Sequence, residues 1–246
     1  GCLVIMLLAL TVVYGTVLLT ADYGRGSIES RYVLGMGHPN ALQCMVWALT
    51  VLGLYLYAER MKWYQYGLVL LTNIGFFLLT DSRTSLLVTI FTIVMVYMEV
   101  KLNTTRWQKY LNQAGIFLFA ASVGFSVFVA ANAYRLYNYF WNWDRSPITM
   151  ALLYLNKVLN GRMYILVENA GFEGTTQTWS LFSRPENNYF FDMGWVRLFY
   201  WYGIIPGMIF VAFIIWYLVY CFQKNDYMAI TLTAALAIYT IVEAHI

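Results

Sequence analysis

The chain has 246 residues, of which 61% are hydrophobic, 19% aromatic and only 11% charged. Ordinary soluble domains carry about 25% charged residues, so this composition excludes an ordinary soluble domain. The formal net charge of +3 is small, and we find no basic stripe, phosphate-cradling glycine loop, CxxC or HExxH pattern. We therefore expect no nucleic-acid partner. The cysteines Cys2, Cys44 and Cys221 fall in or beside apolar segments, which is typical of buried thiols.

Apolar segments of about 20 residues are long enough to cross a bilayer as helices. Their succession predicts an all-α, polytopic transmembrane bundle with about seven spans, the sixth interrupted by Gly203 and Pro206-Gly207. The chain begins at Gly1 without Met and its last apolar segment stops at Ile246, so we expect a fragment with helices missing at both ends. The predicted spans are residues 1–20, 38–58, 63–80, 85–100, 113–134, 193–222 and 228–244.

Between the fifth and sixth predicted spans lies a long segment, residues 135–192, in which no run is long enough to cross. It is too long for a simple connector, so we expect it to be functional or partly folded. Residues 149–160 have amphipathic helical spacing and could lie along the membrane surface. The predicted organisation is thus residues 1–134 with five spans, 135–192 as a large extracytoplasmic loop with interfacial helices, and 193–246 with two spans.

Lysines and arginines are distributed differently along this predicted topology. Four of the five lysines fall in short loops on one side, which the positive-inside rule makes cytoplasmic: Lys62, Lys101, Lys109 and Lys224. Eight of the ten arginines fall on the other side: Arg25, Arg31, Arg83, Arg135, Arg145, Arg162, Arg184 and Arg197. Because arginine binds phosphate and carboxylate groups in a bidentate manner, we expect an outward-facing site for an anionic substrate held at the membrane.

Two motifs precede predicted spans in the first half of the chain. In the first, Arg31 could bind a phosphate while His38 or Asn40 binds a sugar hydroxyl; alternatively, His38-Pro39-Asn40 is a capping arrangement at the headgroup level. In the second, Asp81-Ser82-Arg83, the alternatives are a capped turn with an Asp–Arg pair or a functional anion site. An arginine this close to hydrocarbon is costly unless it is paired or solvated, which favours the functional interpretation.

Further candidates lie in and after the long segment. Arg162 and Arg184 are either solvated loop charges or part of a binding surface. Asp192 and Arg197 bracket the start of the sixth predicted span, either as an ordinary helix start or with Asp192 as a general base in an outer aqueous cavity. Glu243, near the outer end of the seventh predicted span, could equally be structural.

In their order along the chain, these residues resemble the motifs of bacterial Wzy-type oligosaccharide repeat-unit polymerases and the related O-antigen ligases. The resemblance runs from about residue 25 to the C-terminus. The chain departs from the family pattern at Met193-Gly194, where Asn-Ser is usual, and at Pro206. The ligases have a histidine where this chain has Asp192, which favours a polymerase. The matching motifs are Arg31-x6-His38-Pro39-Asn40, Ser82-Arg83-Thr84, Asn160-Gly161-Arg162, Asp192 followed by Tyr202-Gly203-Ile204-Ile205-x-Gly207, and Glu243.

The resemblance implies a glycosyltransferase that joins undecaprenyl-diphosphate-linked oligosaccharide repeat units at the outer face of the cytoplasmic membrane, as in capsule or exopolysaccharide synthesis. It implies no metal or nucleotide-sugar cofactor, and a chain-length regulator and a flippase as partners. The residues it implies as catalytic are Asp192, His38 and Glu243. Those it implies as substrate-binding are Arg31, Asn40, Arg83, Arg162, Arg184 and Arg197.

Other functions remain open at this point. An O-antigen-type ligase would use the same donor with a different acceptor. A flippase or transporter of the same lipid-linked sugars would need arginines along a path to the membrane midplane, whereas the predicted spans are nearly free of charge. A structural membrane subunit without chemistry is a further alternative.

Overall fold

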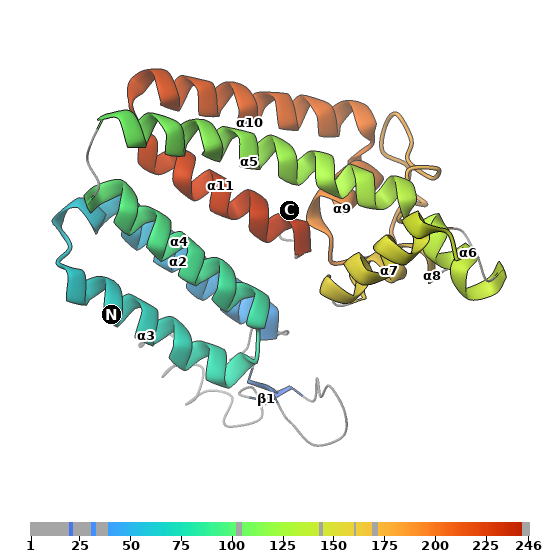
Figure 1. Ribbon diagram of the computed structural model, residues 1–246, viewed down its shortest axis with the longest axis horizontal. Helices are drawn as coiled ribbons and strands as arrows, with labels where there is room; N and C mark the ends of the chain where they lie inside the picture. The colour runs from blue at the N-terminus through green and yellow to red at the C-terminus, as the bar shows by residue number, and fades with distance from the viewer. Residues whose placement is uncertain are drawn as a thin grey trace. The chain divides into compact units, whose positions relative to one another are not determined.

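The computed structural model describes residues 20–21, 31–32, 39–101, 105–142, 145–159, 161–168 and 172–242, and most of these residues are helical (Figure 1). The chain divides into two compact units, Gly1–Thr104 and Thr105–Ile246, and we treat each by itself. The all-α fold class is confirmed for the described residues, apart from one short strand pair. Nearly all of the first predicted span, residues 1–20, lies outside them.

The first unit contains a short antiparallel pair of strands, β1 (Thr20–Ala21) and β2 (Arg31–Tyr32), followed by long helices. A 3-10 turn, η2 (Ala58–Arg60), joins the first two of these helices. The helices fall where the second, third and fourth spans are predicted. They are α2 (Pro39–Tyr57), α3 (Trp63–Thr80) and α4 (Arg83–Lys101).

Polar side chains are buried between the helices of the first unit, while large apolar ones such as Leu78 and Leu87 are exposed. Asn73 on α3 donates a 2.9 Å hydrogen bond to Thr50 on α2. Trp47 on α2 donates a 3.3 Å hydrogen bond to Thr92 on α4. An apolar exterior around a hydrogen-bonded interior is the arrangement expected of helices that associate in lipid, because lipid provides no hydrophobic force between them.

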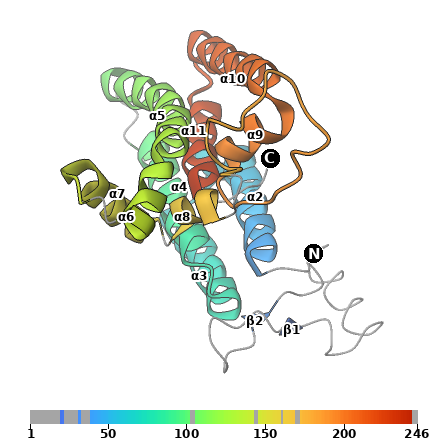
Figure 2. The ribbon, with the colours of Figure 1, turned by 90° about the vertical axis from the view of Figure 1, so that its right-hand side faces the viewer.

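In the second unit, the long helices α5 (Thr105–Asn132), α10 (Ile204–Lys224) and α11 (Tyr227–Val242) lie side by side (Figure 1). Helices α5 and α11 run in parallel and come close at Gly115, where an added Cβ would lie 2.9 Å from Cγ2 of Ile230. Helix α10 runs in the opposite direction. The shorter helices gather at the end where α5 and α11 finish and α10 begins: α6 (Tyr134–Asn142), α7 (Pro147–Val158), α8 (Arg162–Glu168) and α9 (Gly194–Tyr202) (Figure 2).

Within the described residues, four helices are long and apolar enough to cross a membrane, which is consistent with a membrane protein. The predicted count of seven spans is not confirmed. Helix α3 has 18 residues but carries Gln65 and Asn73 and is not among the four. Tyr227–Ile241 is apolar but shorter. The four are Asn40–Arg60, Arg83–Lys101, Gln108–Tyr139 and Ile204–Lys224.

Three details of the predicted topology differ in the structure. Helix α5 begins at Thr105, so Arg106 and Lys109 lie in a helix and not in an inner loop. The segment predicted as one large loop contains α6, α7 and α8, of which α7 matches the predicted amphipathic helix at 149–160. The interruption of the sixth predicted span is confirmed at Gly203, which separates α9 from α10 with a φ of 94°, but not at Pro206-Gly207. Pro206 does not interrupt α10, because amides in the first turn of a helix need no intrahelical acceptor.

Candidate functional site

Helix α9 is the centre of the end of the second unit where the short helices gather. Every residue from Gly194 to Tyr200 is buried. Trp195 donates a 3.3 Å hydrogen bond to the carbonyl of Ala237 on α11, and its ring meets that of Phe119 on α5 edge to face at 5.4 Å. These contacts fix α9 between α5 and α11, so the residues around it are held on a rigid support.

Arg162 and Asp192 meet beside the start of α9. Gly161, with φ 82°, turns the chain into α8, of which Arg162 is the first residue. Nε of Arg162 lies 3.7 Å from Oδ2 of Asp192, and the two side chains are 9% and 38% exposed. A guanidinium stays charged in proteins, so its burial requires a partner of opposite charge or good hydrogen bonds. Asp192 supplies that charge while part of its carboxylate remains open to solvent.

Arg197, on α9, joins this pair. Its guanidinium carbon lies 4.8 Å from the ring centroid of Phe190 and 4.5 Å from that of Trp201. Burial lowers the pKa of Arg197, and the charge of Asp192 raises it, with a smaller contribution from Tyr202. The arginine stays protonated at neutral pH in either case. We call these residues the Arg162–Asp192–Arg197 cluster; it holds two positive charges around one carboxylate.

The loop before α9 is tied to the C-terminal half of that helix. The side-chain amide of Asn187 donates a 2.7 Å hydrogen bond to the carbonyl of Tyr200. The indole of Trp201 donates one of 2.9 Å to the carbonyl of Tyr189. Because Phe190 follows directly, these bonds hold its ring beside Arg197.

The first amides of α10 are already occupied. The amide of Ile204 donates a 2.8 Å hydrogen bond to the carbonyl of Ser180, and that of Ile205 donates one of 3.0 Å to the carbonyl of Leu181. The start of a helix is often an anion site because its first amides point outward. Here carbonyl oxygens of the loop already accept from these amides. An anion at this end would therefore be bound by the arginine side chains and not by the helix start.

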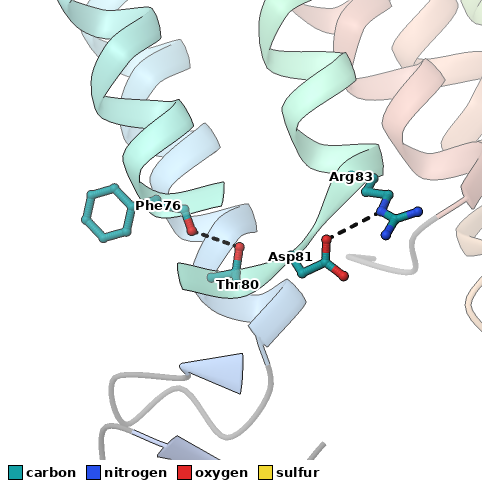
Figure 3. Close-up of polar contacts among 4 residues, drawn as sticks. All are labelled: Phe76, Thr80, Asp81 and Arg83. Atoms are coloured by element: carbon teal, nitrogen blue, oxygen red, sulfur yellow. Dashed lines mark hydrogen bonds and ion pairs between the residues drawn. The ribbon is translucent and has the colours of Figure 1, made fainter. Parts of the chain in front are cut away.

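The Asp81–Arg83 turn belongs to the first unit (Figure 3). Asp81 ends α3 in the left-handed conformation with φ 46°. Nε of Arg83 lies 3.4 Å from Oδ1 of Asp81, and the two side chains are 73% and 37% exposed. Thr80 donates a 3.3 Å hydrogen bond to Gln43, which places this turn at the same end of the first unit as Asn40. The turn therefore has the geometry of the capped-turn alternative, with a solvated ion pair worth less than about 1 kcal/mol.

The remaining predicted residues divide into two groups. Arg184 lies exposed in the loop before α9, and Asn40 is partly buried in the first turn of α2. His38 and Glu243 lie outside the described residues, and of Arg31 only the backbone, in β2, is described. In the parts of the chain that the structure describes, no group of three or more His, Cys, Asp or Glu side chains could hold a metal ion.

Asp192 and Arg197 were expected together at the start of the sixth span, and Arg162 separately; the structure adds the ion pair of Arg162 with Asp192, whose charge also acts on Arg197. It did not identify Phe190 and Trp201, which flank Arg197. The spacing of Arg197 and Trp201, four residues apart on one helix face, was the available signal.

Comparisons with protein families, with curated proteins and with solved structures found no match.

Proposed function

We propose that this protein is a membrane glycosyltransferase that joins lipid-diphosphate-linked oligosaccharide repeat units into a polysaccharide. The Arg162–Asp192–Arg197 cluster carries the proposal, because it combines two buried, permanently charged guanidinium groups with one partly exposed carboxylate. A diphosphate leaving group needs positive charge, and an acceptor hydroxyl needs a proton acceptor. The motif resemblance in the sequence supports the same reaction class.

In the proposed reaction, a sugar hydroxyl of one repeat unit attacks the anomeric carbon of another. Its proton passes to the carboxylate of Asp192 as the new glycosidic bond forms. The bond between the anomeric carbon and the diphosphate oxygen breaks, and the diphosphate leaves with its lipid. Arg162 and Arg197 stabilise the charge that develops on it. The exposed part of Asp192 lets the proton pass on to water.

The charge distribution within the second unit supports an outward-facing site. Lys109, near the start of α5, and Lys224, at the end of α10, belong to the end of the unit away from the cluster. The positive-inside rule favours a cytoplasmic location for that end. The cluster would then face outside the cytoplasmic membrane, where undecaprenyl-linked repeat units are polymerised in the systems that the sequence resembles.

The test uses purified protein in nanodiscs with lipid-diphosphate-linked repeat units, and neither metal nor nucleotide. We expect a ladder of longer glycans on a gel. Asp192→Asn should reduce the rate by at least about 100-fold, the usual contribution of a general base. The matched control is Glu186→Gln, which neutralises an exposed carboxylate in the same loop and should leave the ladder unchanged.

Two outcomes would overturn the proposal. Protein-dependent movement of the same lipid across liposomes, without a ladder, would indicate a flippase. Transfer of a finished glycan to a different acceptor lipid, again without a ladder, would indicate an O-antigen-type ligase. A ladder of wild-type length and rate from Asp192→Asn would contradict the assignment of the base but leave the polymerase intact.

A further inference from the structure

Helix α7 has an apolar surface that the second unit leaves uncovered. Met150, Tyr154 and Val158 are spaced four residues apart, so they form one ridge along the helix. Their side chains are 48%, 72% and 65% exposed. On the other side of α7, Thr149 and Leu152 are buried. The exposed ridge therefore consists of apolar side chains of the kind that usually face a protein interior.

The length of α7 excludes a membrane span. Its 12 residues extend about 18 Å at 1.5 Å per residue, whereas the hydrocarbon core is about 30 Å thick. The helix also has its own start signals, because Pro147 is its first residue and the Ser146 hydroxyl accepts a 3.3 Å hydrogen bond from the amide of Thr149. It is thus a complete short helix and not the end of a longer one.

Helix α7 packs beside the last turns of a candidate membrane span. Leu152 belongs to the same core cluster as Val129 and Ala133, near the end of α5. That part of α5 lies in the last turns of the candidate span Gln108–Tyr139. Figure 1 likewise shows α6, α7 and α8 gathered at this end of α5. Where this candidate span crosses a bilayer, its last turns and α7 beside them would lie near the lipid headgroups.

The two charged residues within residues 145–159 are both positive, and Asp144 precedes them in the sequence. Arg145 precedes the helix, Lys157 lies in its last turn, and both are exposed. Residues 145–159 contain no Asp or Glu. A helix with an apolar face, cationic ends and an interfacial tyrosine suits an anionic membrane surface better than a protein partner, because lipid phosphates complement the charges and acyl chains accept the ridge.

We propose that α7 lies in the membrane interface with Met150, Tyr154 and Val158 inserted among the lipid chains of an anionic leaflet. Arg145 and Lys157 then face the headgroup phosphates. The lipid is the occupant of this surface, and α7 holds the segment between α5 and α9 against the membrane. This inference does not depend on the glycosyltransferase reaction, since it concerns the position of α7 alone.

The test is a nitroxide scan in liposomes containing phosphatidylglycerol. In a background free of the native cysteines, Met150→Cys, Tyr154→Cys and Val158→Cys are each spin-labelled, and collision rates with oxygen and with a water-soluble nickel chelate are measured. Oxygen is enriched in lipid and the chelate in water. Phe213→Cys on the exposed face of α10 serves as the lipid reference and Glu186→Cys as the water reference, since both residues are exposed.

We expect all three α7 positions to collide at least several-fold more with oxygen than with the chelate, approaching the Phe213→Cys reference. Preferential collision with the chelate would place the ridge in water and overturn the proposal. Protection from both reagents would also overturn it, because another part of the chain, a second copy or another protein would then cover the ridge. Labelling three sites independently keeps the test valid if one variant fails to fold.

Discussion

The ion pair between Arg162 and Asp192 is asymmetric. Its Nε–Oδ2 distance is 3.7 Å, and the arginine side chain is 9% exposed against 38% for the aspartate. The guanidinium is therefore fixed inside the protein, while the carboxylate keeps an open side. This asymmetry suits a pair in which the arginine holds a permanent charge and the aspartate stays accessible to a ligand or to water.

The asymmetry predicts how the pair responds to loss of its acid. Asp192→Asn leaves Arg162 buried without its negative partner, and we expect the free energy of unfolding to fall by about 1–2 kcal/mol. This is less than the 3–5 kcal/mol of a fully buried pair, because water reaches Asp192. Unfolding in detergent micelles measures the effect. Arg162→Leu in the same chain should recover part of the loss, and strictly additive effects of the two changes would show that they do not interact.

Gly203 carries a second prediction, about the loop that caps α10. Its φ of 94° is strained for any L side chain, and an added Cβ would lie 2.5 Å from Cα of Phe182. Gly203→Ala should therefore displace residues 180–182 and release the amides of Ile204 and Ile205. We expect faster hydrogen exchange at both amides and a free energy of unfolding lower by more than about 2 kcal/mol.

The control for this prediction is Gly53→Ala on α2, where an added Cβ would meet no described atom within 4 Å. Alanine there should be neutral or should stabilise the helix by up to about 1 kcal/mol. Unchanged exchange at Ile204 and Ile205 in Gly203→Ala would mean that the loop carbonyls of Ser180 and Leu181 do not hold the start of α10.

The long helices could be predicted from the sequence because a membrane helix is marked by a long apolar run. Their polar ends could not, since hydropathy reports contact with lipid and not helical structure. Lys109 and Asn112 thus suggested a loop, whereas α5 continues through both. The same limitation explains why the segment 135–192 was predicted as a loop although it contains three described helices.

The candidate site was predictable residue by residue but not as a cluster. Arg162 and Asp192 were each expected to be functional from residue type and motif order. Their meeting depends on the tertiary fold that brings the start of α8 beside Asp192, which no local pattern encodes. The positions of the Phe190 and Trp201 rings around Arg197 depend on hydrogen bonds between α9 and the loop before it, which have no signature in the sequence.

Gly115 gives a third prediction, at the crossing of α5 and α11. An added Cβ there would lie 2.9 Å from Cγ2 of Ile230, a branched side chain with little freedom to move aside. Gly115→Ala should lower the free energy of unfolding by about 1–3 kcal/mol through overpacking. Gly124→Ala, on the same helix, meets no described atom within 4 Å and should be neutral or slightly stabilising. Equal stability of the two variants in detergent unfolding would contradict this crossing.

Tyr200 predicts how stability depends on pH. It is buried on α9, outside the candidate spans. Burial raises its pKa above the ordinary 10.0, and the charge of Glu173 raises it further. A hydrogen bond with the Tyr189 backbone acts in the opposite direction and lowers it. The folded protein thus favours the neutral phenol. The stabilisation of the folded protein by the neutral Tyr200 phenol is fully present below the pKa of about 10 that the phenol has in the unfolded chain. It is lost as the pH rises toward the folded pKa, because the unfolded chain ionises first.

The measurement compares the free energy of unfolding of wild type and Tyr200→Phe between pH 8 and pH 11. The difference between the two proteins should be constant up to about pH 10 and should then shift in favour of Tyr200→Phe, which has no phenol to ionise. Glu173→Gln should show an intermediate decline, since it removes one cause of the raised pKa while keeping the burial. Parallel profiles for wild type and Tyr200→Phe would show that water reaches the phenol, and hence that the interior around α9 opens more readily than its packing indicates.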